Sequence, residues 1–335
     1  MNIIELDVLN NLATEEYFNQ RMVSEDTGYS IGSVNGAIKH LVEDNYLDDD
    51  FKPTDKALEL MKECAPKNAI ILAAGTGMRS IPINTQISKA MVEVNGEPLI
   101  ERVIKQLREV NIQDIYVVVG FMKEQFEYLI DLYNVKLIVN PNYSKKNNLS
   151  SLALASEYIS NSYIVPCDLW CSKNPFRKQE LYSWYMLSDR LDRGSKFKVN
   201  RKKEILRSTS SEFGNKRVGI AYLQDACARI VRNKLEILNE DNSNAKKSWE
   251  EALYMNNKMI VLARVIKDGI ITEIDTYEQL RELDEESKNL KSYAIDLAAK
   301  TFDVSKEDIC NIEVLKKGMT NKSFLFEAKR KKYIM

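Results

Sequence analysis

Apolar and polar positions follow two rhythms between about residue 68 and residue 166. Short apolar runs predict strands at 69–73, 115–119, 136–139 and 162–166, and helically spaced apolar positions between them predict helices at 98–109, 123–133 and 150–160. This β-α-β succession predicts an α/β fold with a mostly parallel, Rossmann-like sheet and helices on both faces. Ligands of such sheets bind at the carboxyl ends of the strands. Gly75, Gly120 and Asp168 all fall at that edge.

The first 66 residues have helical periodicity instead. Leu6, Val8, Leu9 and Leu12 mark a first helix, residues 24–29 are expected to form a turn, and residues 30–44 and 56–64 are expected to be helical. The polar stretch 45–56 has the pattern of a short wing. Residues 1–66 therefore resemble a winged helix-turn-helix module, a small α(+β) domain, in pattern and not in a specific motif.

Charge is unevenly distributed along the chain, although the net charge of the whole is only −1. Residues 1–66 contain 14 Asp or Glu against 5 Lys or Arg, a net charge of −9, and the remaining residues carry +8. Surfaces that bind nucleic-acid phosphates are basic, and the would-be recognition helix offers only Lys39 and His40. DNA binding is therefore disfavoured, and a regulatory contact or protein partner is favoured for the acidic module. The basic remainder suits a protein that handles phosphates.

Composition narrows the remaining classes of protein. The 335 residues are 44% hydrophobic, with no apolar run of membrane-spanning length and no signal-peptide pattern, so a cytoplasmic protein is expected. The five cysteines are scattered and suit reduced thiols better than disulfides. The single histidine, His40, is far in sequence from the glycine-rich turn described next. A mechanism that needs a histidine base is therefore disfavoured.

The first predicted strand runs into a glycine-rich turn, in the stretch Ala69-Ile-Ile-Leu-Ala-Ala-Gly-Thr-Gly-Met-Arg79. Gly75 and Gly77 would allow backbone N–H groups to approach a phosphate closely, and Arg79 and Lys89 would add positive charge. Ser80 stands where a dinucleotide fingerprint has its third glycine, and the Gly-Lys-Ser/Thr ending of a P-loop is absent. A plain strand followed by a tight turn remains the alternative on these residues alone.

A longer stretch of sequence favours a nucleotide-binding function over a plain turn. The first block, followed by Ser88-Lys-Ala-Met-Val-Glu-Val-Asn-Gly-Glu-Pro-Leu-Ile-Glu-Arg102, resembles the signature of nucleoside-triphosphate nucleotidyltransferases. The blocks at 119–126, 147–152, 166–168 and 273–275 resemble bacterial phosphocholine cytidylyltransferases in particular. The resemblance covers about residues 68–284, so that a nucleotidyltransferase domain is expected at 67–288. It implies transfer of CMP from CTP to phosphocholine, with Mg²⁺ as cofactor.

The resemblance also implies roles for individual residues. The catalytic cations would be Arg79 and Lys89, and the metal ligands Asp168 and Asp275, with Glu273 as a local alternative. Contacts to the nucleotide would come from Leu72, Ala73, Ala74, Gly75, Thr76, Gly77, Gly120, Asn148 and Ser151. Two of these assignments have plain structural alternatives, because Asp275 could cap a helix at 277–284 and the 147–151 loop could cap the helix that follows it. Ser88 also departs from the family, which usually has proline before the lysine.

For the acceptor, the resemblance implies a cation site made by Phe197, Trp249 and Glu250. An aromatic wall and an anion suit a quaternary ammonium, since each cation–π contact contributes about 0.5–2 kcal/mol. Phe197 stands where the family has tryptophan, while the Trp-acid pair is retained. The basic cluster around Lys196 argues partly against a cationic ligand, although charge runs are usually solvated faces. Trp249 could equally be an ordinary core residue.

The last segment, 289–335, resembles the opening strands of a choline kinase, with a Gly-Met-Thr-Asn turn at 318–321 after a helix at 291–301. It ends before a kinase's catalytic aspartates, so it is expected to be a truncated start of such a domain. Two other functions remain open. One is a sugar-1-phosphate nucleotidyltransferase, and the other is a winged-helix transcriptional regulator with a nucleotide-sensing domain.

Overall fold

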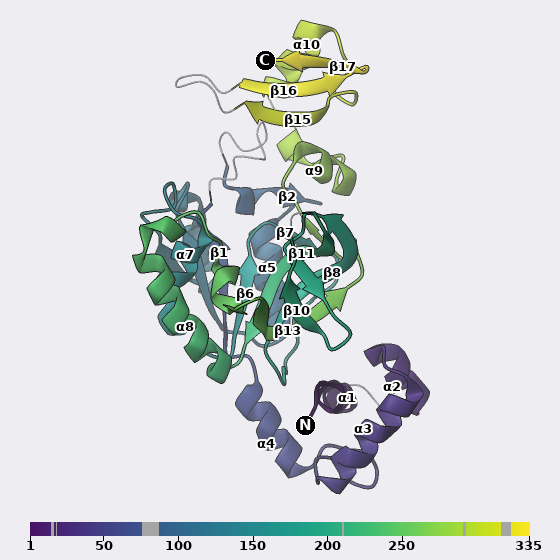
Figure 1. Ribbon diagram of the computed structural model, residues 1–335. Helices are drawn as coiled ribbons and strands as arrows, with labels where there is room; N and C mark the ends of the chain where they lie inside the picture. The colour runs from purple at the N-terminus through teal and green to yellow at the C-terminus, as the bar shows by residue number, and fades with distance from the viewer. Residues whose placement is uncertain (15–16, 18, 76–86, 210, 291–292, 316–322) are drawn as a thin grey trace.

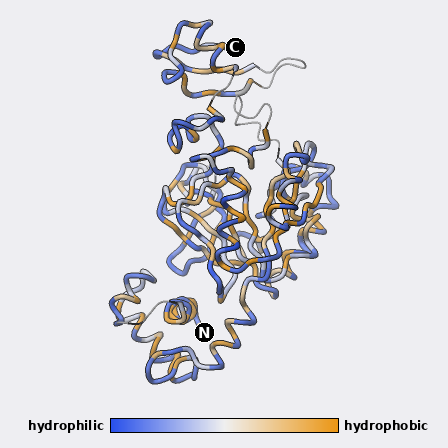
Figure 2. The backbone as a smooth tube through the Cα atoms, turned by 180° about the vertical axis from the view of Figure 1, so that it is seen from behind, coloured by the Kyte–Doolittle hydropathy of each residue, from blue (hydrophilic) through white to orange (hydrophobic). Residues whose placement is uncertain are grey.

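The computed structural model describes the chain except for residues 15–16, 18, 76–86, 210, 291–292 and 316–322. Helices at the N-terminus are followed by a large α/β body and then by a small C-terminal sheet, and the two termini lie at opposite ends of the molecule (Figure 1). Hydrophobic residues are concentrated in the strands of the body (Figure 2). No helix among the described residues is long and apolar enough to cross a membrane.

The N-terminal part consists of helices packed on one small core. Its helices are α1 (Ile3–Thr14), α2 (Gln20–Thr27), α3 (Ile31–Glu43) and α4 (Asp55–Cys64). The apolar stripes of α1 and α3 meet there, with Val8, Leu9, Val34 and Leu41 fully buried or nearly so. Helices were therefore correctly predicted at α1, α3 and α4, and the wing stretch forms one isolated bridge, Leu47 to Pro53.

The predicted turn at 24–29 is wrong in its first residues. The Asn19 side chain accepts a hydrogen bond from the Met22 N–H and so caps α2 at its start, and the helix continues to Thr27. Gly28 ends it in the left-handed conformation, with φ at 75°. Glycine adopts that conformation more readily than residues with a Cβ, so the turn begins at Gly28 and not at Ser24.

A long sheet forms the centre of the body. Its strand order is β5-β4-β1-β6-β11-β8-β13-β10-β9, with β12 paired to β13. The bounds are β1 (Asn68–Ala73), β4 (Asp114–Val119), β5 (Lys136–Val139), β6 (Ser162–Pro166), β8 (Trp184–Arg193), β9 (Phe197–Val199), β10 (Glu204–Arg207), β11 (Phe213–Leu223), β12 (Tyr254–Met255) and β13 (Lys258–Ile266). The first four strands in this order are parallel, in register from 68–73 to 114–119 and from 68–72 to 162–166. The predicted strands and the predicted fold class are confirmed.

Helices cover both faces of the parallel half. Alternate residues of β1 point to opposite sides, so Ile71 packs with Val103 of α5 (Leu99–Glu109) and Leu129 of α6 (Tyr128–Tyr133). Ile70 packs on the other side with residues of α7 (Asn148–Leu154) and α8 (Asp225–Glu240). Two predicted helices are shorter than expected, because 123–126 and 156–158 are 3-10 turns, η4 (Lys123–Phe126) and η5 (Ser156–Tyr158).

Two small strand pairs and several short 3-10 turns lie outside the long sheet. β7 (Leu169–Cys171) pairs with β14 (Ile271–Glu273), and β2 (Glu93–Val94) pairs with β3 (Glu97–Pro98). The short 3-10 turns are η3 (Lys89–Met91), η6 (Asn242–Asn244), η7 (Trp249–Leu253) and η8 (Lys288–Leu290). Helix α9 (Tyr277–Leu283) begins shortly after β14 ends.

The C-terminal part contains α10 (Tyr293–Phe302) and an antiparallel sheet of β15 (Cys310–Leu315), β16 (Ser323–Ala328) and β17 (Lys331–Ile334). Phe324 and Phe326 of this sheet share a core with Ile295 of α10, Leu280 of α9 and Val94 of β2. The segment is thus packed on the body through α9. The turn expected at 318–321 lies outside the described residues.

Contacts also join the N-terminal helices to the body. Leu181 of the body is 6% exposed and belongs to the core of the N-terminal helices. Beside it the Tyr182 hydroxyl donates to Asp7 of α1 at 2.8 Å, and Lys203, between β9 and β10, forms an ion pair with the same carboxylate at 2.8 Å. The helices are therefore fixed to the body by both apolar and charged contacts.

Candidate active site

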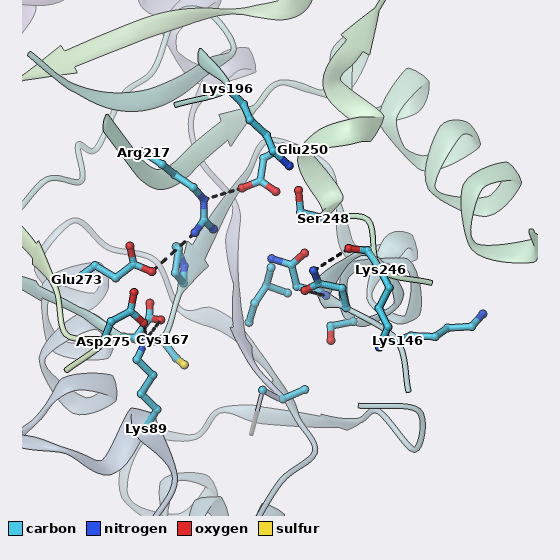
Figure 3. A pocket seen from close by; sticks show the side chains of 18 of the residues that line it. Lys89, Lys146, Cys167, Lys196, Arg217, Lys246, Ser248, Glu250, Glu273 and Asp275 are labelled. Carbon is cyan, nitrogen blue, oxygen red and sulfur yellow. Dashed lines mark hydrogen bonds and ion pairs between the residues drawn. The ribbon is translucent and has the colours of Figure 1, made fainter. Parts of the chain in front are cut away.

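A cavity of about 930 Å³ is lined by residues at the carboxyl ends of β1 and β6 and by Lys216 and Arg217 of β11. Figure 3 shows part of its lining. Its lining includes Ala74 and Gly75 after β1, Asp168 after β6, and Arg217 from β11. Parallel strands place their carboxyl ends at one edge of the sheet, and the polar residues that follow them converge there. The site therefore lies where the strand pattern predicts it.

Three carboxylates meet at one end of this cavity. Oxygen atoms of Asp168, Glu273 and Asp275 all lie within 4.8 Å of one another. The small ladder of β7 and β14 explains why residues so distant in sequence meet: Glu273 is paired with Leu169, and the Ile274 N–H donates to the Asp168 carbonyl at 2.9 Å. Asp168 and Asp275 were both predicted here, and Glu273, which sequence offered only as an alternative, lies with them.

Lys89 balances part of this negative charge. Its ammonium, on η3, donates to both Asp168 and Asp275, and the residue is only 8% exposed. Burial by itself would lower the pKa of Lys89, but the charges of the two aspartates outweigh it and hold the pKa above its usual value. Burial also raises the pKa of Glu273, and the neighbouring carboxylates Asp168 and Asp275 raise it further. Lys89 is thus a fixed cation in a cluster rich in negative charge.

The donor set fits a hard divalent cation. Asp168 Oδ1 is buried and has no hydrogen-bond partner among the described residues, which is unfavourable for a carboxylate oxygen unless a ligand meets it. Mg²⁺ prefers oxygen ligands and is held by carboxylates together with substrate phosphates. Asp168, Glu273 and Asp275 are the residues that would hold it.

Asp275 does not cap α9. Thr276 is the N-cap, since its side chain accepts from the Gln279 N–H while the Gln279 side chain accepts from the Thr276 N–H. Gln279 also accepts from the Asp275 N–H at 2.7 Å. The capping alternative for Asp275 is therefore wrong, and its carboxylate is directed to the cluster.

Part of the predicted nucleotide loop lines the cavity. Leu72, Ala74 and Gly75 are lining residues, whereas Ala73 is buried at the end of β1. Thr76, Gly77 and Arg79 lie outside the described residues.

Gly120 does not line the cavity itself but packs against two residues that do. A Cβ at Gly120 would lie 2.7 Å from Tyr143 Cβ and 2.9 Å from the Ala74 carbonyl oxygen. Glycine is needed here because two chain segments approach closely. Tyr143 and Ala74 both line the cavity, while Gly120 itself does not.

The 147–151 loop both caps a helix and lines the cavity. The Asn147 side chain caps α7 by accepting from the Asn148 N–H at 2.7 Å. Asn148 and Ser151 are lining residues. The Asn148 side-chain oxygen accepts from the Trp249 N–H at 3.0 Å, and Asn140 donates to the Ser151 hydroxyl at 2.9 Å. The capping interpretation and the lining role thus hold together.

At the other end of the cavity the three predicted acceptor residues are only partly together. Phe197 and Glu250 line it, but Trp249 is fully buried behind them. Tyr185 stands between the rings, 5.4 Å from Phe197 and 6.1 Å from Trp249 between centroids. Adjacent residues of a helical turn point in different directions, so Glu250 faces the cavity and Trp249 the core.

Glu250 is held by two donors. The Tyr185 hydroxyl donates to Glu250 Oε1 at 2.8 Å, and Arg217 Nε donates to the same oxygen at 2.9 Å. Burial by itself would raise the pKa of Glu250, but the Arg217 charge and the hydrogen bonds hold it below its usual value. The carboxylate is therefore ionised although it is only 2% exposed.

Sequence reasoning missed Arg217 and Tyr185. Each lies on a strand without a recognisable motif, and only the pairing of β8 with β11 brings them to Glu250. The basic cluster was interpreted as a solvated face, yet two of its members, Arg193 and Lys196, line the cavity together with other cations. These lining cations are Lys145, Lys146, Arg193, Lys196, Lys216 and Lys246.

Comparison with known proteins agrees with this geometry. A family of MobA-like NTP transferase domains matches residues 69–178. A choline-phosphate cytidylyltransferase of Streptococcus pneumoniae is 34% identical over 230 residues, which are 66% of this chain and 98% of the relative. One from Haemophilus influenzae is 37% identical over 118 residues, 35% of this chain and 51% of the relative.

A solved structure of a CTP:phosphocholine cytidylyltransferase from Streptococcus pneumoniae superposes with a TM-score of 0.61 at 31% identity, covering 66% of this chain and 98% of the other. The similarity thus spans nearly the whole length of that protein and leaves about a third of this chain outside it. The lining of the cavity, the order of its blocks and these similarities lead to one assignment: the chain belongs to the choline-phosphate cytidylyltransferase family of nucleotidyltransferases.

Proposed function

We propose that this protein transfers CMP from CTP to phosphocholine, giving CDP-choline and pyrophosphate. The observation that carries the proposal is a single cavity with an acidic cluster and Lys89 at one end and an ionised, buried Glu250 beside Phe197 at the other. The first end suits the triphosphate with its metal, and the second suits a cationic head group. The name of the solved structure from Streptococcus pneumoniae, a CTP:phosphocholine cytidylyltransferase, contains the same pair of substrates.

The chemistry needs few protein groups. A phosphate oxygen of the acceptor attacks the α-phosphorus of CTP, the new P–O bond forms, and the bond to the bridging oxygen breaks so that pyrophosphate leaves. The attacking oxygen is already ionised, so no general base is required and positioning and charge stabilisation supply the catalysis. Mg²⁺, when bound by Asp168, Glu273 and Asp275, would neutralise phosphate charge.

Lys89 would be a protein cation at this step. Its ammonium is held at the carboxylates, so it is already placed where negative charge increases during transfer. A preorganised cation costs no reorganisation at the moment of reaction. Arg79 is the second catalytic candidate, on the segment outside the described residues.

Choline would be recognised at the Glu250 end. Glu250 offers negative charge and Phe197 an aromatic side chain in the cavity wall, and Trp249 supports the arrangement from the core through Tyr185. A cation over an aromatic ring gains about 0.5–2 kcal/mol. A hexose would instead need several hydrogen-bonding partners, whereas Phe197 contributes an apolar wall.

Outside the catalytic body, we propose a regulatory or docking role for the acidic residues 1–66, as a winged-helix-like module without DNA binding. Residues 289–335 would be the start of a choline kinase-like domain. The antiparallel sheet of β15, β16 and β17 supports this second proposal.

A pyrophosphate-release screen tests the function. CTP, UTP, dTTP and ATP are each combined with phosphocholine, phosphoethanolamine and hexose-1-phosphates, with and without Mg²⁺, and the Asp168→Asn variant serves as the inactive control. The expected result is Mg²⁺-dependent release with CTP and phosphocholine at least tenfold above every other pair. Preferred release with a hexose-1-phosphate would refute the assignment.

A further inference from the structure

Arg217 lies between the two ends of the cavity. Its Nε donates to Glu250 at 2.9 Å, and its Nη1 lies 3.8 Å from Glu273 Oε1 in the acidic cluster. Figure 3 shows the guanidinium between Glu250 and the group of Glu273, Asp275 and Lys89. The side chain is one third exposed, 33%, toward the cavity that it lines.

The guanidinium has donors to spare. Arginine carries five N–H donors in a planar fork. Only Nε donates a hydrogen bond to a described residue, because the 3.8 Å contact of Nη1 is too long for one. The N–H groups of Nη1 and Nη2 are thus left at a cavity wall, in the arrangement that binds phosphate with two parallel hydrogen bonds.

Glu250 has an acceptor to spare. Its Oε1 takes both internal hydrogen bonds, while Oε2 is buried and has no partner among the described residues. A buried, unpartnered carboxylate oxygen is unfavourable without a ligand. A cation that contacts Oε2 would therefore complete the carboxylate, just as an anion that contacts Nη1 and Nη2 would complete the guanidinium.

Together, this acceptor and these donors define the ligand as a zwitterion. Along the cavity the fixed charges run negative at Glu250, positive at Arg217 and negative at the carboxylate cluster. A ligand with a cationic head next to Glu250 and a phosphate next to Arg217 would place an opposite charge beside each of these two side chains. Its phosphate would then lie on the side of the proposed metal ligands. The hydroxyl groups of a sugar phosphate could donate to Glu250 Oε2, but they would bring no positive charge to this carboxylate.

We propose that Arg217 binds the phosphate of the acceptor, and that the Glu250–Arg217 pair selects acceptors whose cation and phosphate are joined by a short linker. This inference rests on the proposed function, since it names the residue that orients the attacking phosphate. Arg217 thus has two roles in one side chain, because Nε holds Glu250 and the Nη groups hold the ligand.

A comparison of phosphocholine with choline, which lacks the phosphate, tests separately whether Arg217 binds the phosphate and whether it supports Glu250. Phosphocholine and choline are titrated by calorimetry into the full chain with Mg²⁺ and a non-hydrolysable CTP analogue, for wild type and Arg217→Met. Loss of charged hydrogen bonds is expected to weaken phosphocholine about 10- to 100-fold. Choline should bind equally well or more tightly, since Glu250 loses the cation paired with it and keeps only the hydrogen bond from the Tyr185 hydroxyl. An equal loss for both ligands would mean that Arg217 only supports Glu250, and would overturn the proposal.

Two further variants keep the test decisive. Lys196→Met removes a positive charge from the same cavity at a side chain that is not paired with Glu250 or Glu273, and should weaken phosphocholine far less than Arg217→Met; an equal loss would also overturn the proposal. If Arg217→Met does not fold, Arg217→Lys keeps the charge but loses the fork, and should weaken phosphocholine several-fold while sparing choline.

Failure of the substrate assignment is recognised separately. If the wild-type protein uses another phosphate-bearing acceptor, the choline assignment is wrong. The role of Arg217 is then supported if Arg217→Met weakens that acceptor at least tenfold, and overturned if it does not.

Discussion

Gly120→Ala is expected to disturb both stability and nucleotide binding, because its added methyl group has no space. The new Cβ would lie 2.7 Å from Tyr143 Cβ, 2.8 Å from Tyr143 Cγ and 2.9 Å from the Ala74 carbonyl oxygen. Tyr143 cannot rotate away, since the contact is with the base of its side chain. The Ala74 carbonyl cannot move freely either, since it accepts from the Phe121 N–H at 3.2 Å.

The size of the effect follows from these contacts. Insertion of one methyl group into a packed site costs about 1–3 kcal/mol. For a domain of about 150–250 residues, each kcal/mol lowers Tm by about 2–4 °C, so a decrease of about 2–12 °C is expected. Ala74 and Tyr143 both line the cavity, so relief of the clash displaces the nucleotide site and raises the KM for CTP.

Thermal unfolding and steady-state kinetics measure the two effects, with Gly36→Ala as the matched control. Gly36 is in α3 and has no positive φ, and a methyl group added there would have no atom within 4 Å. Alanine is favoured over glycine in a helix by about 1 kcal/mol, so the control should be as stable as the wild type or more so. A Gly120→Ala protein with unchanged Tm and unchanged KM for CTP would refute the packing argument.

Other predictions concern the charged groups. Asp168→Asn should abolish Mg²⁺-dependent turnover with the fold intact by circular dichroism, since the amide cannot replace a metal-binding carboxylate; near wild-type kcat would remove Asp168 from the metal site. Lys89→Ala should lower kcat about 10²–10³-fold with a smaller change in the KM for CTP. A change confined to KM would limit Lys89 to ground-state binding. Glu250→Gln should weaken phosphocholine by calorimetry far more than CTP, and equal losses would exclude a direct contact with the ammonium.

Sequence patterns predicted the parts of the molecule that depend on local periodicity. β5 and β6 have the predicted bounds, because each is a short apolar run ended by polar residues or proline. The motif and the strand positions predicted Asp168 and Asp275 as metal ligands, and their carboxylates lie together in one cluster with Glu273. It was harder to predict which of two neighbouring residues caps a helix. Thr276, and not Asp275, caps α9, because a threonine with glutamine three residues later satisfies both backbone donors.

Residues that act through long-range pairing could not be predicted. Arg217 and Tyr185 reach Glu250 only because β11 pairs with β8, more than 25 residues away in sequence. The position of Trp249 depended on which side of a 3-10 turn faces the core. Strand and helix patterns contain no information on such contacts between distant elements.

Leu181 and Tyr182 have a consequence for how this protein can be divided. Leu181 completes the core of the N-terminal helices, the Tyr182 hydroxyl donates to Asp7, and the Tyr222 hydroxyl donates to the Cys64 carbonyl. A cut after residue 66 would expose Leu181 to water and leave both hydroxyls without these acceptors. Residues 1–66 and the adjoining body should therefore protect one another in hydrogen exchange as one cooperative unit. We expect no separate unfolding of residues 1–66 at the boundary drawn from sequence.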